Sequence, residues 1–234
     1  MSEIECKNWN EFKSHLTRYA AQSPERRNEL WFRGLGNFHW QLNSTLDRWY
    51  GHLFVDDRYR NNKASELVDA FINECQVIGG VDLVTDEKEV EAELIARHHG
   101  LPSPLIDWTR SPYVAAYFAY SQWDEKSDKI CIWVLDRAKL EPIPTEDYEL
   151  IEQPDLIIKN KRAIQQRGVF LRINTMRSLL EVLGNKVFTK FVLPIDGHEL
   201  QSAMSDLDEM LINSTNMLYD LSGVAKTAAL RVLR

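Results

Sequence analysis

Apolar residues recur every three or four positions along several stretches of the chain, which places them on one face of an α-helix. The clearest stretch runs from Lys63 to Ile78, and Gly79-Gly80 ends it. The same spacing, read together with capping residues and prolines, predicts further helices. The first predicted helix starts near Asn8 or Asn10 and ends before Pro24, and the second runs from Thr85 to near Gly100. A third follows Ser111-Pro112 and covers Tyr113–Trp123. The last two cover Glu199–Asn213 and the stretch from near Ser222 to the end.

Short runs of β-branched and aromatic residues predict strands between these helices. They are Leu30–Phe32, Lys129–Leu135, Val169–Ile173 and Val187–Leu193. The segments 35–62 and 140–154, rich in turn formers or in proline and acidic residues, are predicted to be loops. The pattern predicts a single α+β domain over residues 1–234, with a small central β-sheet packed by several helices. Its core motifs lie at about 29–135, and a C-terminal strand and helix portion lies at about 156–234.

Charge and cysteine content narrow the range of partners. The 234 residues carry a formal net charge of −7, so general binding to duplex nucleic acid or to an anionic membrane is not expected. The N-terminus is too polar for a signal peptide, and the longest apolar run, Val114–Tyr120, is far too short to span a bilayer. Cys6, Cys75 and Cys131 form no paired motif, which favours reduced thiols in a cytoplasmic protein, with Cys75 and Cys131 buried.

The segment from Arg97 to Pro112 concentrates ionisable and hydroxyl groups between two predicted helices. His98 and His99 lie at a helix C-terminus, where the helix dipole is expected to raise the pKa of each imidazole. Asp107 lies between two apolar residues, so burial would require a partner for its carboxylate. These residues are candidate catalytic groups. Alternatively, they only cap helix ends and stabilise the turn through hydrogen bonds. No metal site is predicted, because adjacent histidines point in different directions and no third ligand follows at a familiar spacing.

Arg33-Gly34 follows the first predicted strand, which suggests an anion site. An arginine at a strand end can offer a bidentate fork to a phosphate or carboxylate, and glycine lets backbone approach a ligand closely. The alternative is that Arg33 simply pairs with a carboxylate such as Asp107. Gly34-Leu35-Gly36 does not extend to a dinucleotide-binding fingerprint, so a Rossmann site is excluded.

Basic residues accumulate between Leu156 and Leu180, uninterrupted by any acidic residue. They are Lys159, Lys161, Arg162, Arg167, Arg172 and Arg177. A basic face on an acidic protein favours a specific anionic small molecule or nucleotide, with Gln166 and Arg167 brought to the same site by the strand that follows. Alternatively, this segment is solvated or pairs with the acidic stretch between Asp82 and Glu93.

Motifs spread over most of the chain, in order, are similar to those of the FRG domain family, which is named for a Phe-Arg-Gly motif. The matching residues are Phe32-Arg33-Gly34, Trp40-Gln41-Leu42 and Arg48, the segment Arg97–Thr109, Ala115–Ala119, Gln166–Phe170 and Asp220–Gly223. Two positions depart from the family pattern, because Arg97 stands in place of a glutamine and Pro104 in place of an arginine. The resemblance implies a bacterial or phage protein that acts in phage conflict, as in phage defence or as a toxin.

The order of these motifs also resembles arginine-type ADP-ribosyltransferases, which implies an ADP-ribosyltransferase-like fold and NAD as cofactor. On this resemblance Arg33 holds the NAD pyrophosphate, and Ser103 or Thr109 positions the nicotinamide ribose. His98 or His99 acts as acid or base, oriented by Asp107. Gln166 occupies the place where such enzymes carry a glutamate, and Glu181 or Glu199 are the candidate substitutes for it.

Two other functions stay open at this point. One is a non-catalytic module that binds a nucleotide or an RNA end, in which arginines contact phosphates and a tryptophan stacks a base. The residues concerned are Arg33, Arg97 and the segment 159–177, with Trp31, Trp40 or Trp108 as the stacking ring. The other is a purely structural role for the motifs, with function supplied by a partner protein.

Overall fold

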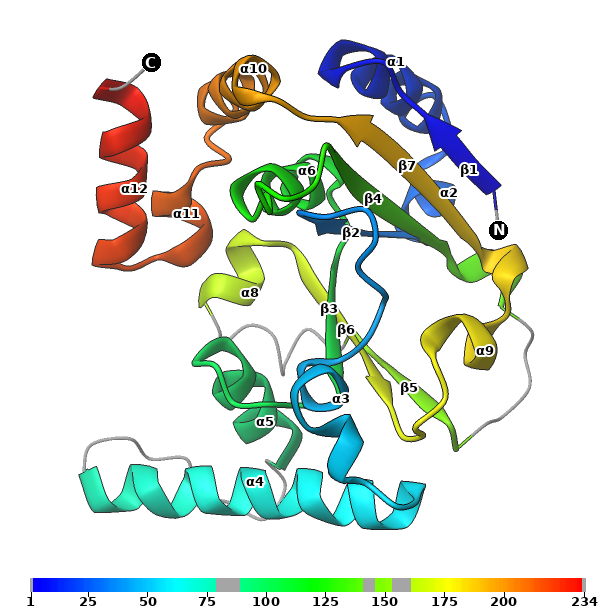
Figure 1. Cartoon of the computed structure of the whole chain (residues 1–234), viewed down its shortest axis with the longest axis vertical. Helices are drawn as coiled ribbons and strands as arrows, with labels where there is room; N and C mark the ends of the chain where they lie inside the picture. Colours follow the sequence, from blue (N-terminus) through cyan, green and yellow to red (C-terminus); the bar gives the residue numbers. More distant parts are fainter. Residues whose placement is uncertain (1, 79–88, 141–145, 153–160, 233–234) are drawn as a thin grey trace.

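A single mixed β-sheet organises the chain, as a computed structural model of residues 2–78, 89–140, 146–152 and 161–232 shows (Figure 1). The strand order is β1-β7-β4-β2-β3-β6-β5, and every neighbouring pair is antiparallel except β1 with β7. The strands are β1 (Ser2–Glu5), β2 (Leu30–Leu35), β3 (Leu105–Thr109), β4 (Lys129–Asp136), β5 (Tyr148–Ile151), β6 (Gly168–Ile173) and β7 (Phe188–Pro194).

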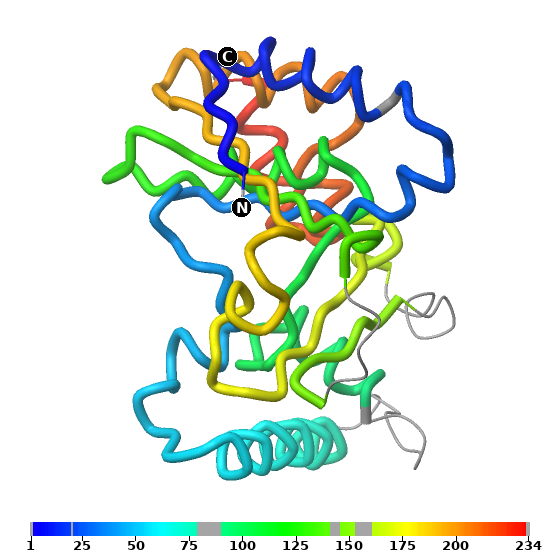
Figure 2. The backbone as a smooth tube through the Cα atoms, turned by 90° about the vertical axis from the view of Figure 1, so that its right-hand side faces the viewer, coloured from blue at the N-terminus to red at the C-terminus, as the bar shows by residue number. Residues whose placement is uncertain are grey.

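Helices and short turns cover this sheet on both faces, as Figures 1 and 2 show from two directions. The α-helices are α1 (Trp9–Ala20), α2 (Pro24–Asn28), α3 (Thr45–Tyr50), α4 (Asp57–Ile78), α5 (Glu89–His98), α6 (Pro112–Ser121), α8 (Lys161–Gln165), α9 (Leu179–Leu183), α10 (Gly197–Glu209), α11 (Ser214–Leu218) and α12 (Leu221–Val232). The described residues also form single-turn 3-10 helices at η1 (Gly51–Leu53), η2 (Arg137–Lys139) and η3 (Asn185–Val187).

The alternation of side chains along the strands divides the core into two main layers. On one face, Phe32, Val134 and Phe191 pack with α1, α6 and α10. On the other, Trp31 and Trp133 belong to a second apolar cluster. Helix α6 is apolar almost all round and lies largely buried against β2 and β4, as expected for a central helix.

The sheet divides between β2 and β3. Strand β2 pairs with β4 along its full length, and β3 pairs with β6 along its full length. Between β2 and β3, however, the register contains a single pair, Phe32 with Thr109. Beyond that pair the two strands move apart, and backbone groups that a continuous ladder would satisfy need other partners.

Most of the predicted elements are confirmed, and the departures have local causes. Strand β3 lies where a turn was expected, because the flanking prolines conceal a five-residue strand. Strand β5 falls within the predicted loop 140–154, and β1 is a polar edge strand. Helices α3 and α4 begin inside the predicted loop 35–62, so α4 starts at Asp57 rather than Lys63. The predicted helix start at Thr85 and the predicted helix end at Gly79-Gly80 lie outside the described residues.

The three cysteines are free and buried, which confirms the expectation for Cys75 and Cys131. Burial raises the pKa of the Cys6 thiol to about 11 and that of Cys131 to about 12, so neither is a reactive thiolate at neutral pH. Among the helices the structure describes, none is both long and apolar enough to cross a membrane.

Candidate functional site

A cavity of about 1060 Å³ opens beside the point where β2 and β3 separate. Its walls come from β2, β3, the segment 39–49 that includes α3, the C-terminal end of α5, α6, α8 and Leu218 of α11. The cavity volume lies just above the range for small-molecule sites in proteins, about 300–1,000 Å³. The site can therefore hold a ligand larger than a single phosphate or sugar.

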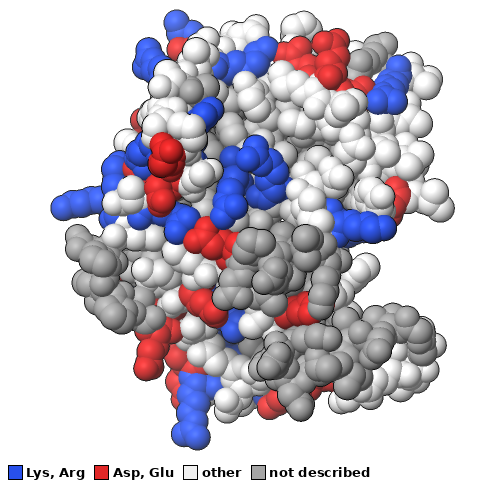
Figure 3. Space-filling model, turned by 180° about the vertical axis from the view of Figure 1, so that it is seen from behind, with Lys and Arg blue, Asp and Glu red and all other residues white. Residues whose placement is uncertain are grey.

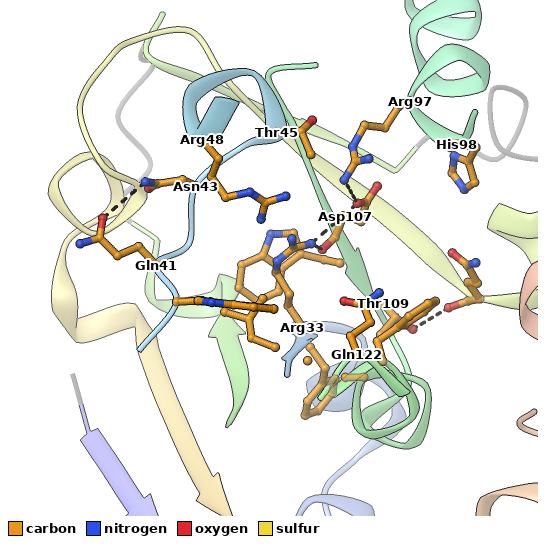
Figure 4. A pocket seen from close by; sticks show the side chains of 18 of the residues that line it. Arg33, Gln41, Asn43, Thr45, Arg48, Arg97, His98, Asp107, Thr109 and Gln122 are labelled. Atoms are coloured by element: carbon orange, nitrogen blue, oxygen red, sulfur yellow. Dashed lines mark hydrogen bonds and ion pairs between the residues drawn. The ribbon is translucent and has the colours of Figure 1, made fainter. Parts of the chain in front are cut away.

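Arg33 stands at the centre of this opening (Figure 4). It lies inside β2, not at the strand end that the sequence suggested, and its side chain is only 13% exposed. Its Nη1 donates a hydrogen bond to the backbone carbonyl of Asp107 (2.5 Å) and lies 3.8 Å from Asp107 Oδ2. The arginine thus satisfies a β3 carbonyl that faces the gap between the strands.

Asp107 joins Arg33 to a second arginine, so the pairing of Arg33 with this carboxylate, which was the alternative to an anion site, is present. Arg97 Nη2 donates to Asp107 Oδ2 over 2.6 Å, and the Asp107 side chain is 37% exposed. Burial acts to raise the pKa of Asp107, but the charges of Arg97, Arg33 and His98 outweigh it and hold the pKa below its ordinary value. The carboxylate is ionised at neutral pH.

Arg48 enters the cavity from α3, and Figure 4 shows its side chain directed towards Arg33. Within the described residues its guanidinium has no hydrogen-bond or ion-pair partner. Burial, together with the positive charge of Arg97, lowers the pKa of Arg48. Its position is fixed by its neighbour Asp47, which accepts two hydrogen bonds, of 2.7 and 2.8 Å, from the fully buried Arg60. Arg60 also donates to the carbonyl of Ile173, which ties α3 and α4 to the end of β6.

The charges in this cluster do not balance. Three guanidinium groups, those of Arg33, Arg48 and Arg97, share one carboxylate. Burial, with the nearby charges of Arg97 and Arg48, lowers the pKa of Arg33 to about 10, so Arg33 still carries its charge at neutral pH. In addition, the Nε atoms of Arg33 and Arg97 are buried without a hydrogen-bond partner in the described part of the chain. Excess positive charge and free donors in one cavity suit an anion with several acceptor oxygens.

The two histidines have different surroundings. His98 lines the cavity, its Nδ1 lies 3.0 Å from the Leu94 carbonyl, and its ring packs against Phe170. A carbonyl oxygen only accepts, so Nδ1 carries the proton and Nε2 is an acceptor in the neutral ring. The expectation of a raised pKa for His98 is wrong, because burial lowers it more than the charge of Asp107 raises it. His99 is exposed and does not line the cavity.

Hydrogen bonds within the protein hold several of the other candidate residues. Thr109 lines the cavity, and its hydroxyl donates to the Gln166 carbonyl (2.6 Å) and accepts from Ser111. Gln166 also lines it, while its amide donates to the Met217 carbonyl. Ser103 is buried outside the cavity and bonds to Glu93, and Arg167 is an exposed residue with a left-handed backbone (φ 48°).

Gly34 and the tryptophans differ in what they present to the cavity. A Cβ on Gly34 would lie 1.8 Å from the Ala115 carbonyl oxygen, so the glycine is required by the approach of α6, whatever ligand binds. Trp31 and Trp108 are buried, at 0% and 2% exposure, and Trp108 stacks on Phe188. Trp108 nevertheless belongs to the cavity lining, together with Trp40 and Trp49, which are 40% and 52% exposed.

The basic segment does not act as one face. Arg172 pairs with Glu93 and Arg177 with Asp147, so the alternative of pairing with the acidic stretch holds for Arg172. On the face seen in Figure 3, basic side chains lie among acidic ones. Among the described basic residues of this segment, only Arg162 lines the cavity, and it bridges the His98 carbonyl (3.0 Å) and Asp220 (2.5 Å). Lys159 lies outside the described residues, and those described contain no metal-binding cluster of three His, Cys, Asp or Glu.

Sequence reasoning missed the contribution of α3. Arg48 belongs to a matching family motif, but nothing in its local pattern indicated that it meets Arg33 and Asp107.

Comparison with known proteins agrees with the resemblance noted above, because the family model for the FRG domain matches residues 28–128. No curated protein and no solved structure matches the chain. The matched residues form the central part of the chain, which is similar to the FRG domain and supplies Arg33, Arg48, Arg97 and Asp107.

Proposed function

We propose that the cavity binds NAD and that the protein is an ADP-ribosyltransferase-like enzyme. The observation that carries this proposal is the meeting of three arginines with one carboxylate where β2 and β3 separate. Residues implied by the transferase resemblance, Arg33, Thr109 and Gln166, come from β2, β3 and the turn before β6, and all three line the cavity.

The arginine cluster supports a pyrophosphate-containing ligand. One carboxylate cannot neutralise three guanidinium groups, and Arg48 has no partner among the described residues. A pyrophosphate carries two negative charges and several acceptor oxygens, and it therefore suits Arg48 and the unused donors of Arg33 and Arg97. The cavity volume also leaves room for the sugars and rings on either side.

The chemistry proposed is cleavage of the bond between the nicotinamide nitrogen and the ribose carbon. Nicotinamide leaves with the bonding electron pair, the ribose carbon becomes cationic, and an acceptor oxygen or nitrogen bonds to it while losing a proton. His98 Nε2 is available to take that proton. Gln166 carries no charge, and Glu181 and Glu199 are held by Ser178 and Trp9 away from the cavity. Asp47 also lines the cavity, but its carboxylate pairs with the buried Arg60. Asp107 is therefore the carboxylate that we assign to the cationic sugar.

A nicotinamide-release assay on Arg48→Ala tests this function. We expect NAD-dependent release by the wild type and a loss of about 10- to 100-fold in the variant, the range for one hydrogen bond to a charged group. The melting temperature should be unchanged, because Arg48 has no protein partner among the described residues. Arg58→Ala is the matched control, an exposed arginine on α4 that is outside the cavity. Equal release by wild type and Arg48→Ala would refute the assignment.

The pH profile of the same reaction tests His98. A general base acts only when neutral, and burial holds the pKa of His98 below its ordinary value of 6.5. The rate should therefore stay constant from pH 8 down to 6.5 and fall only below that. His98→Ala should remove this acid limb. A limb that survives in His98→Ala would show that another group is the base.

A non-catalytic nucleotide-binding module is the second candidate. It is favoured by one observation, the 2.6 Å bond from Arg97 to Asp107, which offsets the negative charge that catalysis would use. Binding of ADP-ribose and NAD with equal affinity, without any nicotinamide release, would support this module instead.

A further inference from the structure

Trp40 presents a large apolar ring to the cavity without being part of the core. It lies in the segment between β2 and α3, lines the cavity and is 40% exposed. Of the other tryptophans considered for stacking, Trp31 is buried outside the cavity lining, and Trp108 lines the cavity but is only 2% exposed. An exposed indole at a cavity wall offers a flat surface to a planar ring.

The segment that carries Trp40 is firmly attached to the sheet. Phe38 donates its N–H to the Lys129 carbonyl (3.1 Å), and Lys190 Nζ donates to the Phe38 carbonyl (2.8 Å). Asn37 Nδ2 donates to Asp124 (3.0 Å), and its carbonyl accepts from Trp40 N–H (3.1 Å). Leu42, two residues later, is buried in the core. A backbone held on both sides means that binding at the indole costs little ordering entropy.

The polar groups of the cavity fall into three successive zones. Figure 4 shows Gln41 and Asn43, which follow Trp40 in sequence, on one side and His98 on the other. The guanidinium groups of Arg33 and Arg48 lie between these two sides. A dinucleotide has the same order, with one base, a central pyrophosphate, and a second ring with its ribose.

We propose that the Trp40 indole is a platform that stacks on the adenine base of the ligand. This proposal rests on the proposed function, that is, on NAD binding in the cavity. The adenine then lies at the Trp40 end, the pyrophosphate at Arg33, Arg48 and Arg97, and the nicotinamide ribose near His98 and Thr109. Ligands that carry a purine base would bind better than ligands that offer only phosphate.

Calorimetric titration of the whole protein with three probes tests this orientation. The probes are ADP-ribose, nicotinamide mononucleotide and inorganic pyrophosphate. Trp40→Ala should weaken ADP-ribose binding about 5- to 150-fold, the range for loss of one stacked base. Its affinity for pyrophosphate and nicotinamide mononucleotide should stay unchanged. Trp40→Phe should retain most of the ADP-ribose affinity, because a phenyl ring still stacks. Tyr59→Ala, an exposed aromatic outside the cavity, is the control.

The outcomes separate the platform from the arginine site. Unchanged ADP-ribose affinity in Trp40→Ala would overturn the platform, and an equal loss for nicotinamide mononucleotide would overturn the orientation. If Arg48→Ala still weakened pyrophosphate binding when either of these two results was found, the arginine site for phosphate would be retained. If the wild type bound neither ADP-ribose nor pyrophosphate, the proposed function would fail, and the platform with it.

Discussion

Replacing Gly34 with alanine is expected to lower the free energy of unfolding by about 3 kcal/mol, at the upper end of the usual cost of overpacking. The added Cβ would lie 1.8 Å from the Ala115 carbonyl oxygen and 2.7 Å from the Ala119 backbone nitrogen. Both atoms belong to the backbone of α6, so relief requires the whole helix to move away from β2. The midpoint and slope of urea unfolding measure the effect.

The same variant should also bind ligand poorly, because α6 supplies Ala115 and Phe118 to the cavity wall. Gly197→Ala is the matched control. Gly197 begins α10, and a Cβ there meets nothing within 4 Å, so alanine should leave stability unchanged or raise it by up to about 1 kcal/mol. A Gly34→Ala protein with the wild-type midpoint would contradict the packing account.

Replacing Asp107 with asparagine should reduce stability and turnover but strengthen anion binding. Without the carboxylate, Arg33 and Arg97 face each other uncompensated, which we expect to cost about 1–3 kcal/mol, less than for a fully buried pair because the side chain is about one-third exposed. Pyrophosphate would gain affinity, since it no longer competes with an internal anion. Nicotinamide release should fall by about 10²- to 10³-fold, as for other losses of transition-state charge stabilisation.

The dependence of the free energy of unfolding on pH, in the acidic range, provides a second test of Asp107. Its pKa in the folded protein lies below the ordinary 3.8, so its contribution is fully present above pH 5 and is lost as the pH falls through the folded pKa. The stability difference between wild type and Asp107→Asn should therefore shrink between pH 6 and pH 3. Asp69→Asn, an exposed change on α4, should match the wild type throughout. A difference that stays constant with pH would contradict the charge pairing.

The sequence by itself determined much of the secondary structure and the neighbourhood of the site. Helix α6 and strands β4, β6 and β7 were predicted because periodicity, capping and β-branched residues act within a few positions of each other. Arg33 and Asp107 were identified as candidates, and even their pairing was one of the stated alternatives. The pairing could be anticipated because a charged residue amid apolar neighbours needs a partner wherever the chain folds.

Only the tertiary structure decided where the cavity lies and what each side chain does there. The separation of β2 from β3, the meeting of Arg48 with Arg33, and the close approach of α6 to Gly34 depend on pairing between distant segments. The lowered pKa of His98 has the same origin. The local helix dipole favours the charged ring, but burial beside Phe170, which lies 72 positions further along the chain, outweighs it. Desolvation depends on everything that surrounds a group, and no local pattern contains that information.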